Sequence, residues 1–245
     1  MNLKISDTPD QSGLAAAIEA ERILQDTLAK QNEARLLLST GASQFEFLKH
    51  LITRNVDWSR VEMFHLDEYI GLPEAHPASF RKYLKERFLQ DVKVKRAYLV
   101  DGEGSVPEVL QSLKEEIARA PIDLALIGIG ENGHIAFNDP PADFDIEEPY
   151  MAVDLNDSCK DQQVREGWFA SRDEVPKQAI TMTVKQIMKS RHILSVVPHG
   201  VKAEAIRNTM LKGVDPQFPS TILKTHSHWQ LYLDQASASL IYQLR

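Results

Sequence analysis

Short runs of strand-forming apolar residues alternate along the chain with segments whose apolar residues recur at helical spacing. The expected strands are Arg35 to Ser39, Val61 to Leu66, Ala97 to Val100, Ile122 to Ile129, His192 to Val197 and Trp229 to Leu233. The expected helices are Leu14 to Lys30, Pro77 to Gln90, Ser105 to Arg119 and Val201 to Leu211. Such alternation favours parallel βαβ units. The pattern therefore predicts an α/β fold, a single doubly wound domain over residues 1–245 with a mostly parallel sheet and helices on both faces.

The stretch from Asn138 to Pro149 interrupts this alternation. It carries three prolines and five acidic residues, which favour a long loop over a helix or a strand. Loops of this length inside a compact domain are often functional lids.

Composition narrows the function classes. The 43% hydrophobic and 26% charged fractions are typical of a folded globular protein. The net charge of −7 argues against nucleic acid as a partner, because phosphate backbones are bound by clustered Lys and Arg. No apolar run approaches the roughly 20 residues of a membrane span, and residues 1–11 lack a signal-peptide pattern, so we expect a cytoplasmic protein without membrane association. The single cysteine, Cys159, excludes an intramolecular disulfide and a cysteine zinc cage, and we expect a buried structural thiol.

Two polar clusters that follow expected strands suit an anion. Ligands of open α/β sheets bind at the carboxyl ends of the strands. After the first expected strand the hydroxyl-rich turn suits a phosphate, or is an ordinary helix cap; its residues are Ser39, Thr40, Gly41, Ala42 and Ser43. After the strand His192 to Val197, Lys202 lies in the first turn of a helix, where a cation needs an anionic partner or is simply solvated.

A third cluster follows the strand Val61 to Leu66 and offers a carboxylate. Asp67 is delivered from an apolar run to the carboxyl end of the sheet, where it can accept a proton from carbon. The alternative is a solvated acidic turn.

The fourth cluster follows the strand Ile122 to Ile129 and matches the dinucleotide-binding spacing G-x-G-x-x-G from Gly128 to Gly133. A dinucleotide site needs a helix directly afterwards, and Pro140 and Pro141 exclude one, so no NAD is expected. The turn instead presents His134, with Asn132 and Asp139 close enough in sequence to orient it as an acid-base group. The alternative is a structural histidine.

Two runs carry a resemblance to a known family. Phe64 to Pro73, read FHLDEYIGLP, and Gly128 to Asn138, read GIGENGHIAFN, resemble the glucosamine-6-phosphate deaminase and 6-phosphogluconolactonase superfamily, and the likeness covers nearly the whole chain. Both runs look like the deaminase branch, because lactonases typically carry an arginine at Tyr69 and continue differently after His134.

The resemblance implies a role for each candidate residue. Asp67 would be the base for enolisation and His134 the ring-opening acid-base group, with Asn132 and Asp139 as its partners. The Ser39 to Ser43 turn, Lys202 and Arg165 would hold the phosphate of a sugar.

The sequence also departs from the family pattern at two places. Asp139 stands where the family usually has glutamate, so its contact with His134 would need a shifted loop or a bridging water. In the phosphate turn, Ala42 replaces a small residue that is often glycine, and Gln44 replaces a proline. These replacements narrow the backbone freedom of the turn.

The resemblance thus implies an aldose-ketose isomerase that releases ammonia from glucosamine 6-phosphate. Three alternatives stay open: the galactosamine epimer as substrate, a 6-phosphogluconolactonase, and a sugar-phosphate sensor without catalysis. The acids and histidines are not spaced as a known metal-ligand set, so neither a metal nor an organic cofactor is expected. The expected partner is a small sugar phosphate, and a homo-oligomer is possible.

Overall fold

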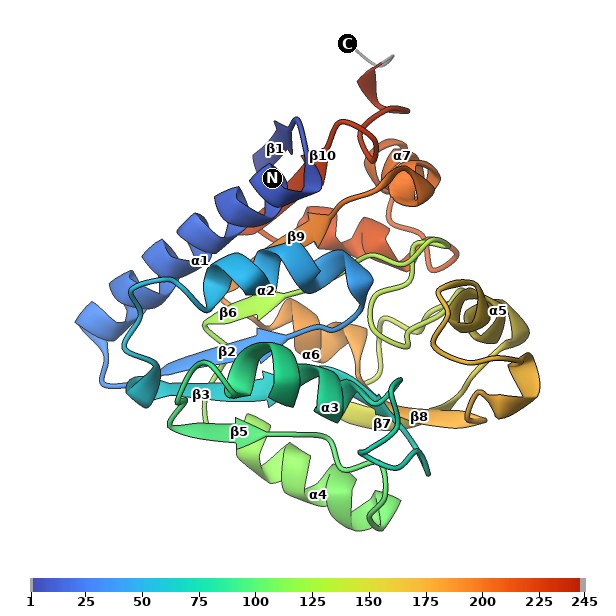
Figure 1. The fold of residues 1–245 in the computed structure, drawn as a ribbon, viewed down its shortest axis with the longest axis horizontal. Helices are drawn as coiled ribbons and strands as arrows, with labels where there is room; N and C mark the ends of the chain where they lie inside the picture. Colours follow the sequence, from blue (N-terminus) through green and yellow to red (C-terminus); the bar gives the residue numbers. More distant parts are fainter. Residues whose placement is uncertain (1, 243–245) are drawn as a thin grey trace.

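A seven-stranded sheet, in which every neighbouring pair of strands is parallel, forms the centre of the molecule (Figure 1). The structure is a computed structural model that describes residues 2–242. Across the sheet the strands are β1 (Asn2–Ser6), β10 (Trp229–Asp234), β9 (His192–Val197), β6 (Leu124–Leu126), β2 (Ala34–Leu38), β3 (Val61–His65) and β5 (Arg96–Tyr98). The predicted α/β class with a mostly parallel sheet is confirmed.

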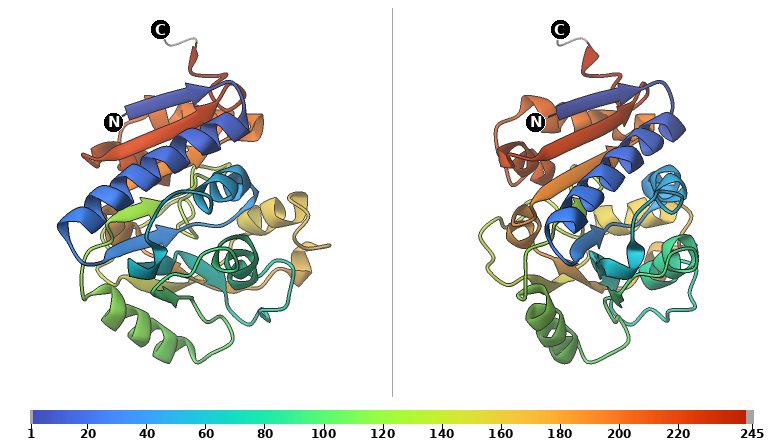
Figure 2. Two further views of the ribbon diagram at one scale, coloured as in Figure 1. Left: turned by 60° about the vertical axis from the view of Figure 1, so that its left-hand side comes forward. Right: turned by 90° about the vertical axis from the view of Figure 1, so that its left-hand side faces the viewer.

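Helices cover both faces of this sheet, and the side views separate the two sets (Figure 2). One apolar core joins the sheet to α1 (Pro9–Lys30), α2 (Phe45–Leu51) and α3 (Phe80–Leu84). The other joins it to α4 (Val106–Ile117), α6 (Val184–Met188) and α7 (Ala203–Leu211). In β2 the side chains alternate between these cores, because Leu36 and Leu38 enter the first and Leu37 the second. This two-sided burial explains why the strand is apolar throughout.

A second sheet of three antiparallel strands was not predicted. Its order is β4 (Asp67–Tyr69), β8 (Gln178–Met182) and β7 (Tyr150–Asp154). A third apolar cluster packs α5 (Asp157–Arg165) against this sheet, with Cys159 of the helix beside Tyr69 and Ala179. The small sheet therefore carries α5 at the right-hand side of the view in Figure 1.

The structure corrects several predicted boundaries. The strand expected from Ile122 to Ile129 is regular only over Leu124–Leu126, because the chain leaves the sheet before the glycine turn. The helix expected from Pro77 to Gln90 is α3 followed by a π-helical segment, Lys85–Leu89. Short 3-10 helices occupy Ala42–Gln44, Trp58–Arg60, Arg172–Glu174, Gly200–Lys202 and Pro219–Thr225. Between residues 2 and 242 no helix combines the length and the apolar character needed to cross a membrane.

Four neighbouring strands bring the polar clusters together. The order β9, β6, β2, β3 places these strands side by side, and all four run in the same direction. Each of the four clusters follows one of these strands, so all of them emerge at the same edge of the sheet. The chain order across these strands changes direction here, which is where open parallel sheets bind their ligands.

Candidate functional site

A cavity of about 410 Å³ opens at this edge of the sheet. Its lining includes the Ser39–Ser43 turn, Asp67, His134, Arg165 and Lys202. The two remaining candidate residues, Asn132 and Asp139, contact His134 and do not line the cavity. The structure therefore brings every candidate residue into or directly behind one cavity.

The turn after β2 presents polar groups to the cavity. Gly41 has φ +104°, a conformation that side-chain-bearing residues rarely adopt, whereas the neighbouring Ala42 begins a 3-10 helix. Alanine is therefore accommodated at position 42, and the expected narrowing of backbone freedom does not affect the turn. Ser39 Oγ is buried and has no hydrogen-bond partner among residues 2–242. Gln44 Nε2 donates to Ser43 Oγ at 2.9 Å and to the Val196 carbonyl at 3.1 Å, which ties the turn to β9.

Lys202 supplies a buried positive charge. Burial lowers the pKa of its ammonium, and the carboxylates of Glu166 and Glu131 offset this only in part. Among the described residues no hydrogen-bonding partner contributes to that shift. The positive charge of a buried lysine and the buried Ser39 hydroxyl, which lie in one cavity, together suit a phosphate.

Asp67 and Glu68 are adjacent acids in different environments. The Asp67 carboxyl lines the cavity, and burial together with the nearby Glu68 charge raises its pKa to about 8. Glu68 is fully buried and accepts from Ser79 Oγ at 3.0 Å, Arg81 N at 2.8 Å and Arg81 Nε at 3.2 Å. Glu68 therefore holds the following loop and helix in place, and Asp67 is the acid available to a ligand.

His134 is oriented from behind by two residues. Its Nδ1 lies 2.7 Å from Asn132 Oδ1 and 3.2 Å from Asp139 Oδ1, and Asn132 Nδ2 donates to that same Asp139 oxygen at 3.2 Å. The shorter Asp139 side chain thus reaches the imidazole directly, and the expected shifted contact or bridging water is not needed. Burial opposes the charge on Asp139, but hydrogen bonds from His134, Asn132 and Cys159 outweigh it and lower its pKa. The arrangement leaves Nε2 of the imidazole for a ligand.

The glycine turn makes room for this imidazole. A Cβ atom on Gly130 would overlap the ring of His134, so only glycine fits beneath it. Gly133 has φ +86°, and its amide donates to the Gly130 carbonyl at 3.0 Å. The G-x-G-x-x-G spacing therefore serves to seat a histidine, and no helix follows that could bind a pyrophosphate.

The stretch from Asn138 to Pro149 is a long loop, as predicted, and a helix rather than this loop forms the cavity wall. None of residues 138–149 lines the cavity, although the loop supplies Asp139. The wall comes from α5 and the residues after it, which sequence patterns did not single out: Gln162, Gln163, Glu166 and Trp168. Gln162 Nε2 donates to Glu166 at 2.7 Å, and Trp168 Nε1 donates to it at 3.2 Å. Arg165 lines the cavity, but its guanidinium pairs with Glu131 at 2.9 Å.

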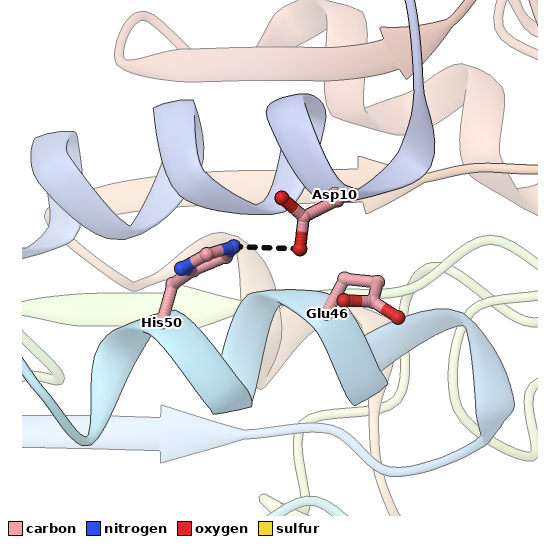
Figure 3. Close-up of side chains that lie close together, drawn as sticks. All are labelled: Asp10, Glu46 and His50. Atoms are coloured by element: carbon pink, nitrogen blue, oxygen red, sulfur yellow. Dashed lines mark hydrogen bonds and ion pairs between the residues drawn. The ribbon is translucent and has the colours of Figure 1, made fainter.

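One group of side chains within residues 2–242 has the spacing of metal ligands. The ligand atoms of Asp10 on α1 and of Glu46 and His50 on α2 all lie within 4.8 Å of one another (Figure 3). Lys49 Nζ donates to Asp10 at 2.9 Å and to Glu46 at 3.3 Å, so a lysine already supplies the positive charge there. None of these residues lines the cavity, and the group ties α1 to α2.

Comparison with known proteins agrees with this geometry. The family model of glucosamine-6-phosphate isomerases and 6-phosphogluconolactonases matches residues 7–232. A glucosamine-6-phosphate deaminase of Bacillus cereus (strain B4264) is 30% identical over 241 residues, which cover 98% of this chain and 89% of the relative. One from Bacillus thuringiensis (strain Al Hakam) is 31% identical over the same shares.

Solved structures agree as well. The structure of a monomeric glucosamine-6-phosphate deaminase superposes with a TM-score of 0.89 at 29% identity, covering 98% of this chain and all of that one. A 6-phosphogluconolactonase from Trypanosoma brucei superposes with a TM-score of 0.79 at 15% identity, covering 97% of each chain, and shows a shared fold.

Proposed function

The chain belongs to the glucosamine-6-phosphate isomerase and 6-phosphogluconolactonase family, and we propose that it converts glucosamine 6-phosphate to fructose 6-phosphate and ammonia. The observation that carries the proposal is the pairing, across one cavity, of the Asp67 carboxyl with an imidazole oriented by a carboxylate. A buried carboxyl of raised pKa and an oriented histidine are the two proton-transfer groups that this isomerisation requires. The 30% and 31% identical relatives bear the name of the same enzyme.

We assign the phosphate to the end of the cavity formed by the Ser39–Ser43 turn and Lys202. Within residues 2–242 the buried Ser39 hydroxyl lacks a hydrogen-bond partner, and it would meet the phosphate oxygens together with the Lys202 ammonium. Arg165 joins them when it exchanges the Glu131 carboxylate for the phosphate. Binding energy from this end, which is remote from the reacting carbons, fixes the sugar against Asp67 and His134.

Ring opening is assigned to His134. Its Nε2 takes the proton of the C1 hydroxyl and returns a proton to the ring oxygen, which gives the open-chain aldehyde. Asp139 and Asn132 hold Nδ1 throughout, and the Asp139 carboxylate stabilises the imidazolium formed in passing.

Proton transfer at carbon is assigned to Asp67. In its ionised form it removes the proton from C2, which gives an enolamine, and then delivers a proton to C1 to form the imine of the ketose. Water adds to C2 of this imine and ammonia leaves, so one C–N bond is hydrolysed and fructose 6-phosphate remains.

We also propose that this reaction takes place in the cytoplasm, which fits a chain whose single thiol, Cys159, is buried and unpaired.

A panel of three substrates tests the proposal. Ammonia and ketose 6-phosphate are measured with glucosamine 6-phosphate and galactosamine 6-phosphate, and acid release is measured with 6-phosphogluconolactone. We expect ammonia and ketose in equal amounts from glucosamine 6-phosphate. Ammonia from galactosamine 6-phosphate alone would change the epimer, acid release without ammonia would identify a lactonase, and binding without turnover would identify a sensor.

A further inference from the structure

The turn after β9 holds a histidine in a backbone conformation that favours glycine. His199 has φ +79° and ψ +141°, and Ala136 is the other non-glycine residue with positive φ among residues 2–242. Such a conformation is strained for a residue with a Cβ atom and persists only where the surroundings impose it. A histidine in this strained conformation indicates that its side chain has a role.

The fold clamps the backbone of His199 and not its imidazole. Its amide donates to both carboxylate oxygens of Asp234, at 3.2 Å each, and its carbonyl accepts from the amide of Lys202 at 3.0 Å. Within residues 2–242 all its hydrogen bonds are made by the backbone, so a glycine at this position would keep them. The side chain is exposed, and packing does not account for it.

His199 does, however, line the cavity, beside the residues assigned to the phosphate. His199 lies three residues before Lys202, and the cavity wall contains both of them together with the Ser39–Ser43 turn. The positive charge at this end is partly offset, because Glu131 and Glu166 lie near Lys202 and Glu131 also pairs with Arg165. A phosphate at this end therefore gains from a further donor that carries no carboxylate partner.

We propose that His199 is an additional phosphate ligand, whose imidazole N–H donates to a phosphate oxygen of the substrate. The inference rests on the proposed function, which places the sugar phosphate in this cavity. The strained backbone conformation then directs the imidazole donor toward the phosphate. The hydrogen bonds from the His199 amide to Asp234 hold the backbone in this conformation.

Replacing the histidine by glycine separates the ligand from the strain. In His199→Gly we expect the KM for glucosamine 6-phosphate to rise about ten- to a hundredfold, as for the loss of a hydrogen bond to a charged group. We expect kcat to stay close to that of the wild type and the Tm to rise, because glycine relieves the strain. The inhibition constant of inorganic phosphate should rise by the same factor as KM. His199→Asn, which tolerates positive φ and keeps a donor, should recover part of the affinity.

His228→Ala is the matched control, because this exposed histidine directly precedes β10 and lies at the opposite edge of the sheet. Unchanged KM and phosphate inhibition in His199→Gly, with an active wild type, would overturn the assignment, and so would a loss confined to kcat. A wild type without turnover would reject the proposed function instead. In that event, inorganic phosphate is added to the wild type and to His199→Gly, and its binding is measured by the change in Tm. The difference between the two proteins still decides the role of His199.

Discussion

Neighbouring residues with the same chemistry have different tasks here because their surroundings differ. Glu68 accepts five hydrogen bonds from Tyr69, Ser79, Phe80 and Arg81, which stabilise its carboxylate. Asp67 is also buried, but only burial and the charge of Glu68 act on its pKa, and both raise it. The side chain without compensating donors is the one poised to exchange protons with a substrate.

This difference leads to a pH dependence. Because the pKa of Asp67 is raised to about 8 and the base must be ionised, kcat/KM should rise with pH below about 8 and level off above it. The rise approaches about tenfold per pH unit well below the pKa. The profile is measured between pH 5.5 and 9.5 with glucosamine 6-phosphate. A Lys202→Met variant should lose affinity but keep the same midpoint, and a flat profile in the wild type would contradict the assignment of the base.

The space beneath His134 gives a second prediction at this scale. In Gly130→Ala the new Cβ overlaps the imidazole, which must leave its place against Asp139. A displacement of about 1 Å at a reacting group can cost about a hundredfold in rate, so we expect kcat to fall by that order. Gly213→Ala is the control, because a Cβ there meets no atom within 4 Å. Equal kcat in the two variants would show that turnover does not depend on the position of the His134 imidazole above Gly130.

At the scale of elements, the sequence predicts those parts whose pattern is local. The strands around Leu36 and Ile193 are apolar throughout and were found within a few residues of their bounds. Asp67 and His134 could be placed because parallel strands end at a common edge. The helix α5 was missed because its sequence, DSCKDQQVR, offers no apolar stripe.

The same lack of a local pattern hid the part of the cavity wall that α5 forms. The position of α5 depends on Cys159 and its neighbours packing against a small antiparallel sheet whose strands have three to five residues. Contacts between segments so far apart in the chain leave no periodic signal in the sequence. Gln163 was therefore out of reach of sequence reasoning, whereas His199 stood in a recognisable turn beside Lys202 and was passed over.

Since α5 is short and polar, its cap is important. Asn156 Oδ1 accepts from the amide of Cys159 at 2.8 Å, and Asn156→Ala should cost about 1 kcal/mol of helix stability. We expect faster amide hydrogen exchange in α5 and a higher KM, because this helix forms a wall of the cavity. Thr8→Ala removes the matching cap of α1, which does not line the cavity, and should leave KM unchanged. Equal KM in both variants would contradict the role of α5.

At the scale of the whole molecule, one chain brings the candidate residues together in one cavity. Four parallel strands deliver Asp67, His134, Lys202 and the phosphate turn to one edge, and α5 closes the other side. The volume of about 410 Å³ falls in the range of small-molecule sites, which is about 300–1,000 Å³.

We therefore expect a single chain to be active. The activity per chain should stay constant when the protein is diluted, and sedimentation at assay concentration should give a mass near 27.7 kDa. The solved relative that superposes with a TM-score of 0.89 is described as monomeric. Activity that falls on dilution, in step with dissociation of a larger species, would show that assembly completes the site.

The proposed reaction is the deamination of glucosamine 6-phosphate in this cavity, with Asp67 as the base. The most direct test measures ammonia and fructose 6-phosphate together, with the wild type and with Asp67→Asn, whose amide cannot accept the proton. We expect equal amounts of both products from the wild type, and from the variant a loss of turnover of at least about a hundredfold with substrate binding retained. Turnover in Asp67→Asn close to that of the wild type, or no ammonia from the wild type, would contradict the account.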